Sequence, residues 1–275
     1  MSITMPSRTV LITGCSTGIG RDTAQRLSRA GYQVAATARD TGSLTGLQVA
    51  LKLALDVTDS ASVKSAVEET IDRLGRIDVL VNNAGYGVRG AVEEVSDEQF
   101  RSMFDVNVLG ALRMVQAVTP HMREQGEGRI INISSFAGRL SLPANGTYSA
   151  TKFALEALSD ASRLELAAFG IRVVLIEPGN IRSQFYATAQ AGGREALSNP
   201  TSPYRALYQR YSRVMGSMRR REAGPEVVSR TVQRAIEARR PKARYLVAVS
   251  LPNRLILYAG DSVRDYILTR LFRIR

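Results

Sequence analysis

Short apolar segments and longer amphipathic segments alternate along most of the chain. The apolar segments are nearly continuous in hydrophobic residues, as in Val10-Leu11-Ile12, which is typical of strands buried on both faces of a sheet. The longer segments repeat apolar residues at steps of three and four, which predicts helices with one buried face. Strands are expected at residues 8–13, 33–38, 49–57, 77–82, 129–134 and 171–177, and helices at 19–29, 60–74, 96–123 and 148–169. This alternation predicts an α/β fold with a doubly wound parallel sheet.

The regular pattern stops after Pro178. Residues 184–203 contain two adjacent glycines and two prolines without a clear period, and they predict a long loop. A helix at 225–239, a strand at 245–249 and a terminal helix at 254–268 are expected beyond it. Because no repeat and no low-complexity linker interrupts the chain, we expect a single domain over residues 1–275 with a C-terminal helical extension.

Composition excludes several kinds of site. The chain has one cysteine, Cys15, and one histidine, His121, so a disulfide framework and a Cys/His zinc site are excluded, and we expect no metal. No apolar run of about 18 residues could span a bilayer, and the N-terminus lacks the pattern of a secretory signal. We therefore expect a cytoplasmic protein.

The net charge of +12 is concentrated near the end of the chain. Residues 1–204 carry 20 basic and 20 acidic residues, whereas residues 205–275 carry 17 basic and 5 acidic ones. The whole positive excess therefore lies in the last quarter of the sequence, where it could meet an anionic partner.

A glycine-rich segment follows the first expected strand and opens the first expected helix. It reads Thr13-Gly14-Cys15-Ser16-Thr17-Gly18-Ile19-Gly20. Glycines allow a pyrophosphate to approach the backbone, and a helix N-terminus offers free N–H groups to it. The spacing differs from the usual G-x-G-x-x-G pattern, and a tight turn alone would also explain these glycines.

A second group of residues carries acid–base chemistry. Tyr148 and Lys152 are four positions apart on an expected helix and share a face, and Ser135 ends the preceding strand. A tyrosine has a pKa of about 10, and a neighbouring ammonium lowers that pKa toward the range useful for proton transfer. The three residues therefore form a candidate catalytic set.

Taken together, these motifs resemble those of the short-chain dehydrogenase/reductase family over residues 7–250. The resemblance implies a single Rossmann-like, seven-stranded domain with a variable substrate loop at 184–218 and a basic C-terminal helix at 253–275. It implies catalytic roles for Asn107, Ser135, Tyr148 and Lys152. It also implies that the cofactor is bound by Gly14, Ser16, Thr17, Gly18, Ile19, Gly20, Arg39, Asp56, Val57, Asn83, Ala84, Gly85, Tyr148, Lys152, Pro178, Gly179, Ile181 and Ser183.

In the mechanism that the resemblance implies, Tyr148 exchanges a proton with the substrate oxygen while a hydride passes to or from the nicotinamide. Lys152 binds the nicotinamide ribose and lowers the pKa of Tyr148. Ser135 donates a hydrogen bond to the substrate oxygen. Asn107 holds a water that links Lys152 to solvent.

Cofactor choice depends on the end of the second strand. The position where the family places an NAD-selecting aspartate is Ala38, and Arg39 follows it. An arginine suits the 2′-phosphate of NADP, whereas a carboxylate would bind the 2′-hydroxyl of NAD. We expect NADP(H) to be favoured over NAD(H), while Asp40 keeps the NAD alternative open.

The substrate is expected to be lipophilic. Tyr204, Tyr208 and Tyr211 share one helical face within the substrate loop, either as a lid over an apolar substrate or as ordinary packing of an extra helix. The motifs look most like the hydroxysteroid and retinol dehydrogenase branch. We therefore expect NADP(H)-dependent interconversion of a steroid- or retinoid-like secondary alcohol and its ketone or aldehyde, the alternative being a non-catalytic NADP-binding regulator or scaffold.

The terminal helix has apolar residues at three- to four-residue steps, among them Ile256, Val263 and Ile267. Three interpretations compete: packing onto the domain or a second subunit, peripheral contact with a membrane, and binding of nucleic acid. We expect no nucleic acid, since no nucleic-acid motif accompanies the charge. A homodimer or homotetramer is expected.

Overall fold

Seven parallel strands form one sheet at the centre of the computed structural model, which describes residues 8–219 and 222–274. Residues 1–7 and 275, at the ends of the expected domain, lie outside the described residues. The sheet order is β3-β2-β1-β4-β5-β6-β7. The strands are β1 Thr9–Ile12, β2 Gln33–Ala38, β3 Leu51–Ala54, β4 Val79–Asn82, β5 Gly128–Ile133, β6 Ile171–Pro178 and β7 Arg244–Val247. This arrangement confirms the predicted fold class.

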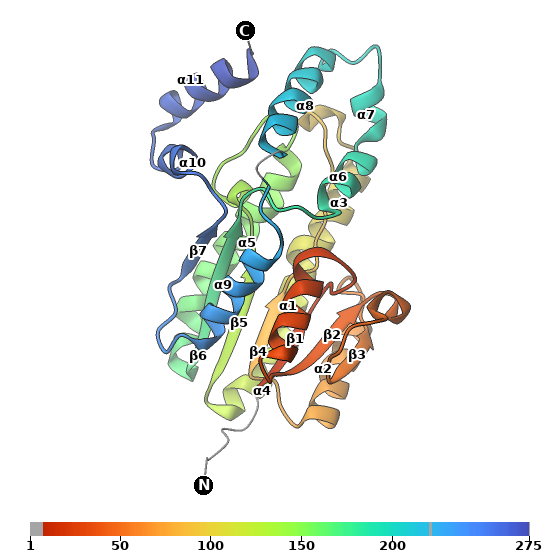
Figure 1. Cartoon of the computed structure of the whole chain (residues 1–275), viewed down its shortest axis with the longest axis vertical. Helices are drawn as coiled ribbons and strands as arrows, with labels where there is room; N and C mark the ends of the chain where they lie inside the picture. The colour runs from red at the N-terminus through yellow and green to blue at the C-terminus, as the bar shows by residue number, and fades with distance from the viewer. Residues whose placement is uncertain (1–7, 220–221, 275) are drawn as a thin grey trace.

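Helices cover both faces of the sheet (Figure 1). The helices of the sheet layers are α1 Gly18–Arg29, α2 Ser60–Leu74, α3 Asp97–Phe104, α4 Gly110–Gln125, α5 Gly146–Glu165 and α9 Glu226–Glu237. Side chains of α1 and α9 pack with Val10 and Ile12 in one core. Those of α2 and α4 pack with Leu11 in the other. Because successive side chains of a strand point to opposite faces, the continuous apolar run of β1 serves both cores.

The strand order reverses between β1 and β4. In such a sheet the loops after these two strands separate and leave a crevice at the carboxyl ends, which is where open α/β sheets bind ligands. The glycine-rich segment follows β1, and Asn83-Ala84-Gly85 follows β4. The fold therefore brings these two sequence motifs together.

The expected single helix over residues 96–123 is interrupted in its middle. It begins with the predicted capping box, in which the Ser96 side chain accepts from the Gln99 backbone and the Gln99 side chain accepts from the Ser96 backbone. Between α3 and α4, a π-helical turn covers Asp105–Leu109 and contains Asn107. A π-helical turn inserts an extra residue into a helix and often marks a functional site.

The region after β6 differs most from expectation. The predicted loop at 184–203 is wrong, because it contains α6 Phe185–Gly192 and α7 Arg194–Ser198, and α8 Arg205–Arg219 follows. The predicted terminal helix is broken into α10 Leu251–Ile256 and α11 Asp261–Phe272. Gly260 has extended backbone angles just before α11, so the helix cannot continue through it.

Helices that follow β6 cover one end of the sheet, and we call the pair α8 and α11 the roof. Figure 1 shows α8 and α11 at the end of the molecule opposite the N-terminus, and the two helices are in contact. Phe272 is fully buried and stacks on Tyr211 with ring centroids 6.2 Å apart. The C-terminal extension thus packs on its own domain. Over the part of the chain that the structure describes, no helix combines the length and apolar character needed to span a membrane.

Candidate active site

Two glycines of the segment between β1 and α1, Gly14 and Gly20, have no room for a side chain. Gly14 and Gly18 have φ of 71° and 59°, which favours glycine at both positions. A Cβ at Gly20 would lie 2.3 Å from the Gly14 carbonyl oxygen and 2.4 Å from the Asn83 amide nitrogen. The turn therefore exposes its backbone, and the N-terminus of α1, to the crevice.

Side-chain hydrogen bonds tie this turn to the segment after β4. The Thr13 hydroxyl accepts from the backbone N–H groups of Asn83 and Ala84, both at 2.9 Å. The Asn83 amide donates to the carbonyls of Thr13 and Gly14, also at 2.9 Å. The two motifs therefore form one hydrogen-bonded unit, and Gly14, Asn83 and Ala84 line the cavity.

The end of β2 supplies the charged groups at one side of the crevice. Arg39 and Asp40 are both exposed there. The Asp40 carboxylate caps the next helical turn, Thr41–Leu44, by accepting from the Gly42 backbone N–H at 2.9 Å. Asp56, across the crevice, accepts from the backbone and hydroxyl of Thr58, and these bonds, with the charge of Arg39, lower the pKa of its carboxyl.

Tyr148 lies in the first turn of α5 and is buried. Burial raises the pKa of its phenol, while a hydrogen bond with Ser135 and the positive charge of Arg89 act in the opposite direction. This differs from the expected lowering of the pKa by Lys152, because burial outweighs the nearby charges and the cation that acts on the phenol is Arg89. Tyr148 is therefore protonated at neutral pH and can donate a proton.

Lys152 is one turn further along α5 and is also buried. Its Nζ donates to the Ile133 carbonyl at 2.8 Å and lies 6.0 Å from the centre of the Tyr148 ring. Burial lowers its pKa to about 8, partly opposed by the negative charge of Glu156. The ammonium is held beside the phenol by the end of β5.

Asn107 occupies the π-helical turn and ties three segments together. Its Oδ1 accepts from the Tyr86 backbone N–H at 2.9 Å, and its Nδ2 donates to the Tyr86 carbonyl at 2.8 Å and to Thr151 at 3.0 Å. Both amide hydrogens are therefore used within the protein. The side chain fixes the segment after Gly85 against α5, and its predicted hold on a water stays a prediction.

One cavity of about 1100 Å³ joins these parts. Of the residues predicted from the sequence, all but Gly20 and Asn107 line it; these two lie behind its wall. Such a volume is at the upper limit of small-ligand pockets. Over the described residues, no cluster of three or more His, Cys, Asp and Glu could hold a metal ion.

The far end of the cavity is lined by residues that sequence reasoning missed. They are Arg89, Leu142, Asn253, Ile256, Leu268 and Phe272. Phe185 of α6 contacts the Tyr148 ring at a centroid distance of 5.2 Å, so α6 covers the candidate catalytic residue directly. Of the three tyrosines expected on one helical face, Tyr204 lies just before α8 and packs with Tyr208, whereas Tyr211 lines the cavity.

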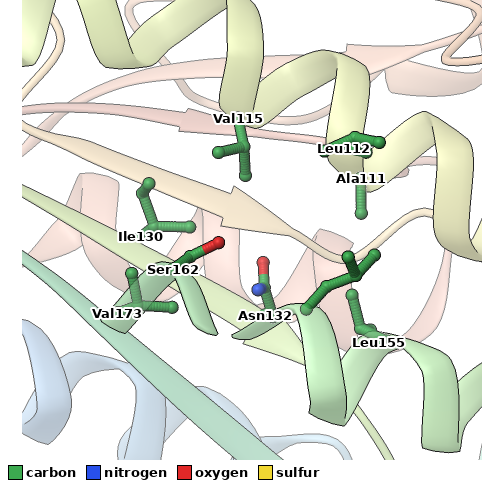
Figure 2. Close-up of a pocket in the computed structure, with 9 residues that line it drawn as sticks. Ala111, Leu112, Val115, Ile130, Asn132, Leu155, Ser162 and Val173 are labelled. Carbon is green, nitrogen blue, oxygen red and sulfur yellow. The ribbon is translucent and has the colours of Figure 1, made fainter. Parts of the chain in front are cut away.

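A second hollow lies between α4 and α5 and is too small for a substrate. Its volume is about 20 Å³, and Figure 2 shows that mostly apolar side chains line it, such as Leu112, Val115 and Leu155. Only Asn132 and Ser162 are polar among its lining residues. The hollow carries no group for catalysis.

Comparisons with known proteins agree with this geometry. Residues 8–192 match the family model described as short chain dehydrogenase. The chain is 35% identical to the 3-ketodihydrosphingosine reductase of Bacteroides thetaiotaomicron, over 98% of this chain and 100% of that protein. It is 36% identical to human 17-beta-hydroxysteroid dehydrogenase type 1, over 88% of this chain and 77% of that protein.

Solved structures are similar over most of the chain. A short-chain dehydrogenase from Streptomyces avermitilis has a TM-score of 0.81 and 33% identity, covering 100% of this chain and 98% of that one. A Burkholderia phymatum short chain dehydrogenase/reductase in complex with NAD has a TM-score of 0.79 and 25% identity, covering 96% and 95%. An alcohol dehydrogenase from Thermococcus sibiricus complexed with 5-hydroxy-NADP has a TM-score of 0.71 and 26% identity, covering 88% and 97%.

Proposed function

The chain belongs to the short chain dehydrogenase family and is an oxidoreductase acting on CH–OH groups; from that premise we propose that it uses NADP(H) to interconvert a lipophilic secondary alcohol and its ketone or aldehyde. One observation carries the proposal. Ser135, Tyr148 and Lys152 line the same cavity as the glycine-rich turn at one end and the aromatic roof at the other.

The residues present fit a dinucleotide. Gly14, Gly18 and Gly20 leave the backbone bare, and the pyrophosphate would lie against it at the N-terminus of α1. Lys152 would bind the nicotinamide ribose, with Pro178, Gly179, Ile181 and Ser183 along the same wall. When bound, the cofactor supplies or accepts the hydride.

The chain itself supplies the proton and holds the substrate oxygen. In the reduction, protonated Tyr148 donates its proton to the carbonyl oxygen, and the raised pKa of the buried phenol keeps that proton available at neutral pH. Ser135 hydrogen-bonds the same oxygen. The positive charge of Arg89, and that of Lys152 at 6.0 Å from the ring centre, would stabilise the negative charge left on Tyr148.

The NADP preference rests on Arg39. Arg39 is exposed and lines the cavity directly after the last residue of β2, Ala38. The Asp40 carboxylate accepts from the Gly42 backbone N–H and so caps the Thr41–Leu44 turn. An exposed guanidinium that pairs with a 2′-phosphate therefore favours NADP(H) over NAD(H).

The lipophilic substrate is supported by the roof. Leu142, Met215, Leu268, Leu271 and Phe272 give the cavity an apolar end next to Tyr148. The names of the two relatives compared above refer to a ketodihydrosphingosine and a hydroxysteroid, both lipophilic molecules. A steroid- or retinoid-like size agrees with a cavity of about 1100 Å³ that also accommodates a cofactor.

We propose peripheral membrane contact through α10 and α11. Leu251, Leu255 and Tyr258 are 69%, 63% and 79% exposed, while Ile256 and Leu268 of the same helices line the cavity. These helices would therefore open the cavity toward a lipid surface, assisted by the C-terminal arginines. Co-sedimentation with anionic vesicles should fall with rising salt and when these three residues become serine, whereas Leu164→Ser on α5 should leave it unchanged.

A homodimer or homotetramer is proposed from the surface of α4 and α5. Leu109 directly precedes α4, and Phe153 and Leu158 lie on α5; all three are large apolar residues that are at least a third exposed, and Leu158 also lines the small hollow between these helices. Light scattering of Phe153→Asp should report a smaller particle than the wild type. The predicted cytoplasmic location stays a prediction.

The deciding experiment measures NADPH and NADH oxidation with a panel of steroid, retinoid and aromatic carbonyl compounds. Turnover of lipophilic carbonyls with NADPH supports the proposal. Tight NADPH binding with no turnover of any of them would favour the alternative, a non-catalytic NADP-binding regulator or scaffold. Comparable kcat/KM with NADH would overturn the cofactor assignment.

A further inference from the structure

Arg89 is a buried cation inside the cavity. Its side chain is 7% exposed and lies between the two aromatic rings that join the catalytic residues to the roof. The guanidinium carbon is 5.7 Å from the centre of the Tyr148 ring and 6.0 Å from that of Tyr211. The residue therefore stands where the substrate must pass from the apolar end of the cavity to Tyr148.

The guanidinium lacks the partner that a buried charge requires. Its Nε and Nη1 are buried and have no hydrogen-bond partner. Within the described part of the chain, no carboxylate lies within ion-pair distance of it, and the Glu94 carboxylate accepts from Ser202 and Tyr208 instead. Because buried charges in proteins are almost always paired, the missing partner is expected to come from outside the chain.

The backbone around Arg89 holds the side chain in this place. Its N–H donates to the Ala189 carbonyl of α6 at 3.2 Å, and the next N–H, of Gly90, donates to the Ala144 carbonyl at 3.2 Å. A Cβ at Gly193 would lie 1.8 Å from the Arg89 carbonyl oxygen, so the chain after α6 packs directly against this segment. The segment is thus clamped between α6 and the start of α5.

We propose that Arg89 binds a carboxylate of the substrate beside the reacting carbon, so that the preferred substrates are lipophilic oxo acids and hydroxy acids. This inference rests on the proposed function, since Tyr148 marks the reacting carbon. A guanidinium binds a carboxylate through charge-assisted hydrogen bonds, and Arg89 lines the cavity between Tyr148 and Tyr211. The apolar remainder of the substrate lies against Leu142, Met215 and Leu271.

The reaction leaves this ion pair unchanged. In the reduction, the carbonyl carbon gains a hydride from NADPH, and its oxygen gains the proton of Tyr148. The products are a hydroxy acid and NADP⁺, and the carboxylate stays on Arg89 throughout. Arg89 therefore orients the substrate and selects its charge.

The first test compares acids with their esters. Oxododecanoates that differ in the position of the oxo group, and their methyl esters, are reduced with NADPH by the wild type and by Arg89→Met. We expect the kcat/KM ratio of the best acid over its ester to fall by about 30- to 100-fold in Arg89→Met, mainly through KM. The exposed Arg194→Met is the matched control and should keep the wild-type ratio.

Two outcomes overturn the inference. Arg89 would act only through Tyr148 if Arg89→Met slowed acid and ester by the same factor, and it would bind no carboxylate if wild type preferred the ester. A long-chain amino ketone, whose charge is opposite, should be the poorest wild-type substrate.

A binding measurement separates this inference from the proposed function. Titration calorimetry follows dodecanoate binding to the NADP⁺-loaded wild type and to Arg89→Met. Binding that is at least tenfold weaker in the variant supports Arg89 even if no oxo compound is turned over, which would instead count against the proposed function. Equal affinity in both proteins overturns the role of Arg89.

Discussion

The two ends of the cavity are built in different ways. At the cofactor end, the glycine-rich turn and the segment after β4 are joined by short hydrogen bonds of Thr13 and Asn83, and one added methyl group at Gly20 would overlap a carbonyl. At the roof, α8 and α11 meet through aromatic rings such as Tyr211 and Phe272, and a Cβ at Gly216 would touch nothing.

The two ends of the cavity differ in construction because they would bind different ligands. A dinucleotide has a fixed shape, so its site is made of backbone and tolerates no variation. Under the proposed function, a lipophilic substrate would be recognised by side chains of the roof helices, so that end could change without disturbing the cofactor site. Tyr148 and Arg89 stand where the two ends meet.

The largest expected effect is at that meeting point. Tyr148→Phe removes the phenolic proton that Tyr148 would transfer and should lower kcat about 1000-fold, because a positioned acid contributes that order of rate. NADPH affinity should stay within about twofold, since the phenyl ring still fills its place. Stopped-flow NADPH oxidation and a fluorescence titration measure the two quantities.

The exposed Tyr258→Phe is the control for that substitution and should behave as wild type. Residual turnover of Tyr148→Phe above about a tenth of wild type would remove Tyr148 from the role of proton donor.

A pair of glycine substitutions tests the contrast between the two ends directly. Gly20→Ala should destabilise the protein by about 1–3 kcal/mol and weaken NADPH binding at least tenfold, because the methyl group overlaps Gly14 and Asn83. Gly216→Ala, in the last turn of α8, should instead stabilise it by about 0.5–1 kcal/mol. Urea unfolding and NADPH titration measure both; similar losses in the two variants would contradict the contrast.

The residues of the cofactor end could be predicted from sequence because each motif lies within a short stretch of the chain. The glycine spacing after β1 and the Tyr148–Lys152 spacing on α5 each lie within one strand–turn–helix or one helical turn. Apolar periodicity likewise predicts most strands, since both faces of a parallel sheet are buried. The π-helical turn at Asn107 was missed because it breaks no hydrophobic pattern.

The roof could not be predicted because its contacts join distant segments. Nothing near Arg89 in the sequence indicates that it lies beside Tyr148 and Tyr211. Residues 184–203 form two short helices whose sides pack on the segment around Arg89, although glycines and prolines predict a loop. The charge excess of the tail likewise indicated a partner without showing that Phe272 would be buried in the protein itself.

Cofactor choice provides a smaller, reversible test at the cofactor end. Wild type should prefer NADPH over NADH by about 10- to 100-fold, the effect of a partly exposed guanidinium–phosphate pair. Ala38→Asp combined with Arg39→Leu should invert that preference, because a carboxylate then stands where the ribose hydroxyl binds. Kd values for both cofactors measure it, and a wild-type preference for NADH would assign the selection to Asp40.

The smallest expected effect is at Glu177 in β6, whose neighbour Pro178 lines the cavity. Its carboxylate is buried, with Nη1 of Arg139 at 3.5 Å and Nε of Arg244 at 3.2 Å. Burial and the negative charge of Glu156 raise its pKa from 4.5 to about 7, against the opposing charges of the two arginines. The folded protein therefore holds this proton more tightly than the unfolded chain does.

The raised pKa of Glu177 makes the folded protein more stable at low pH than at high pH. The stabilisation is complete below pH 4.5 and is lost as pH rises through 7, where the buried carboxyl ionises. Glu177→Gln cannot ionise, so its Tm relative to wild type should increase between pH 5 and pH 8, by the equivalent of about 1–2 kcal/mol. The exposed Glu165→Gln should show no such trend across the same thermal melts. A Tm difference for Glu177→Gln that is constant, or that shrinks as pH rises, would mean that the two arginines outweigh burial and that Glu177 is ionised throughout this range.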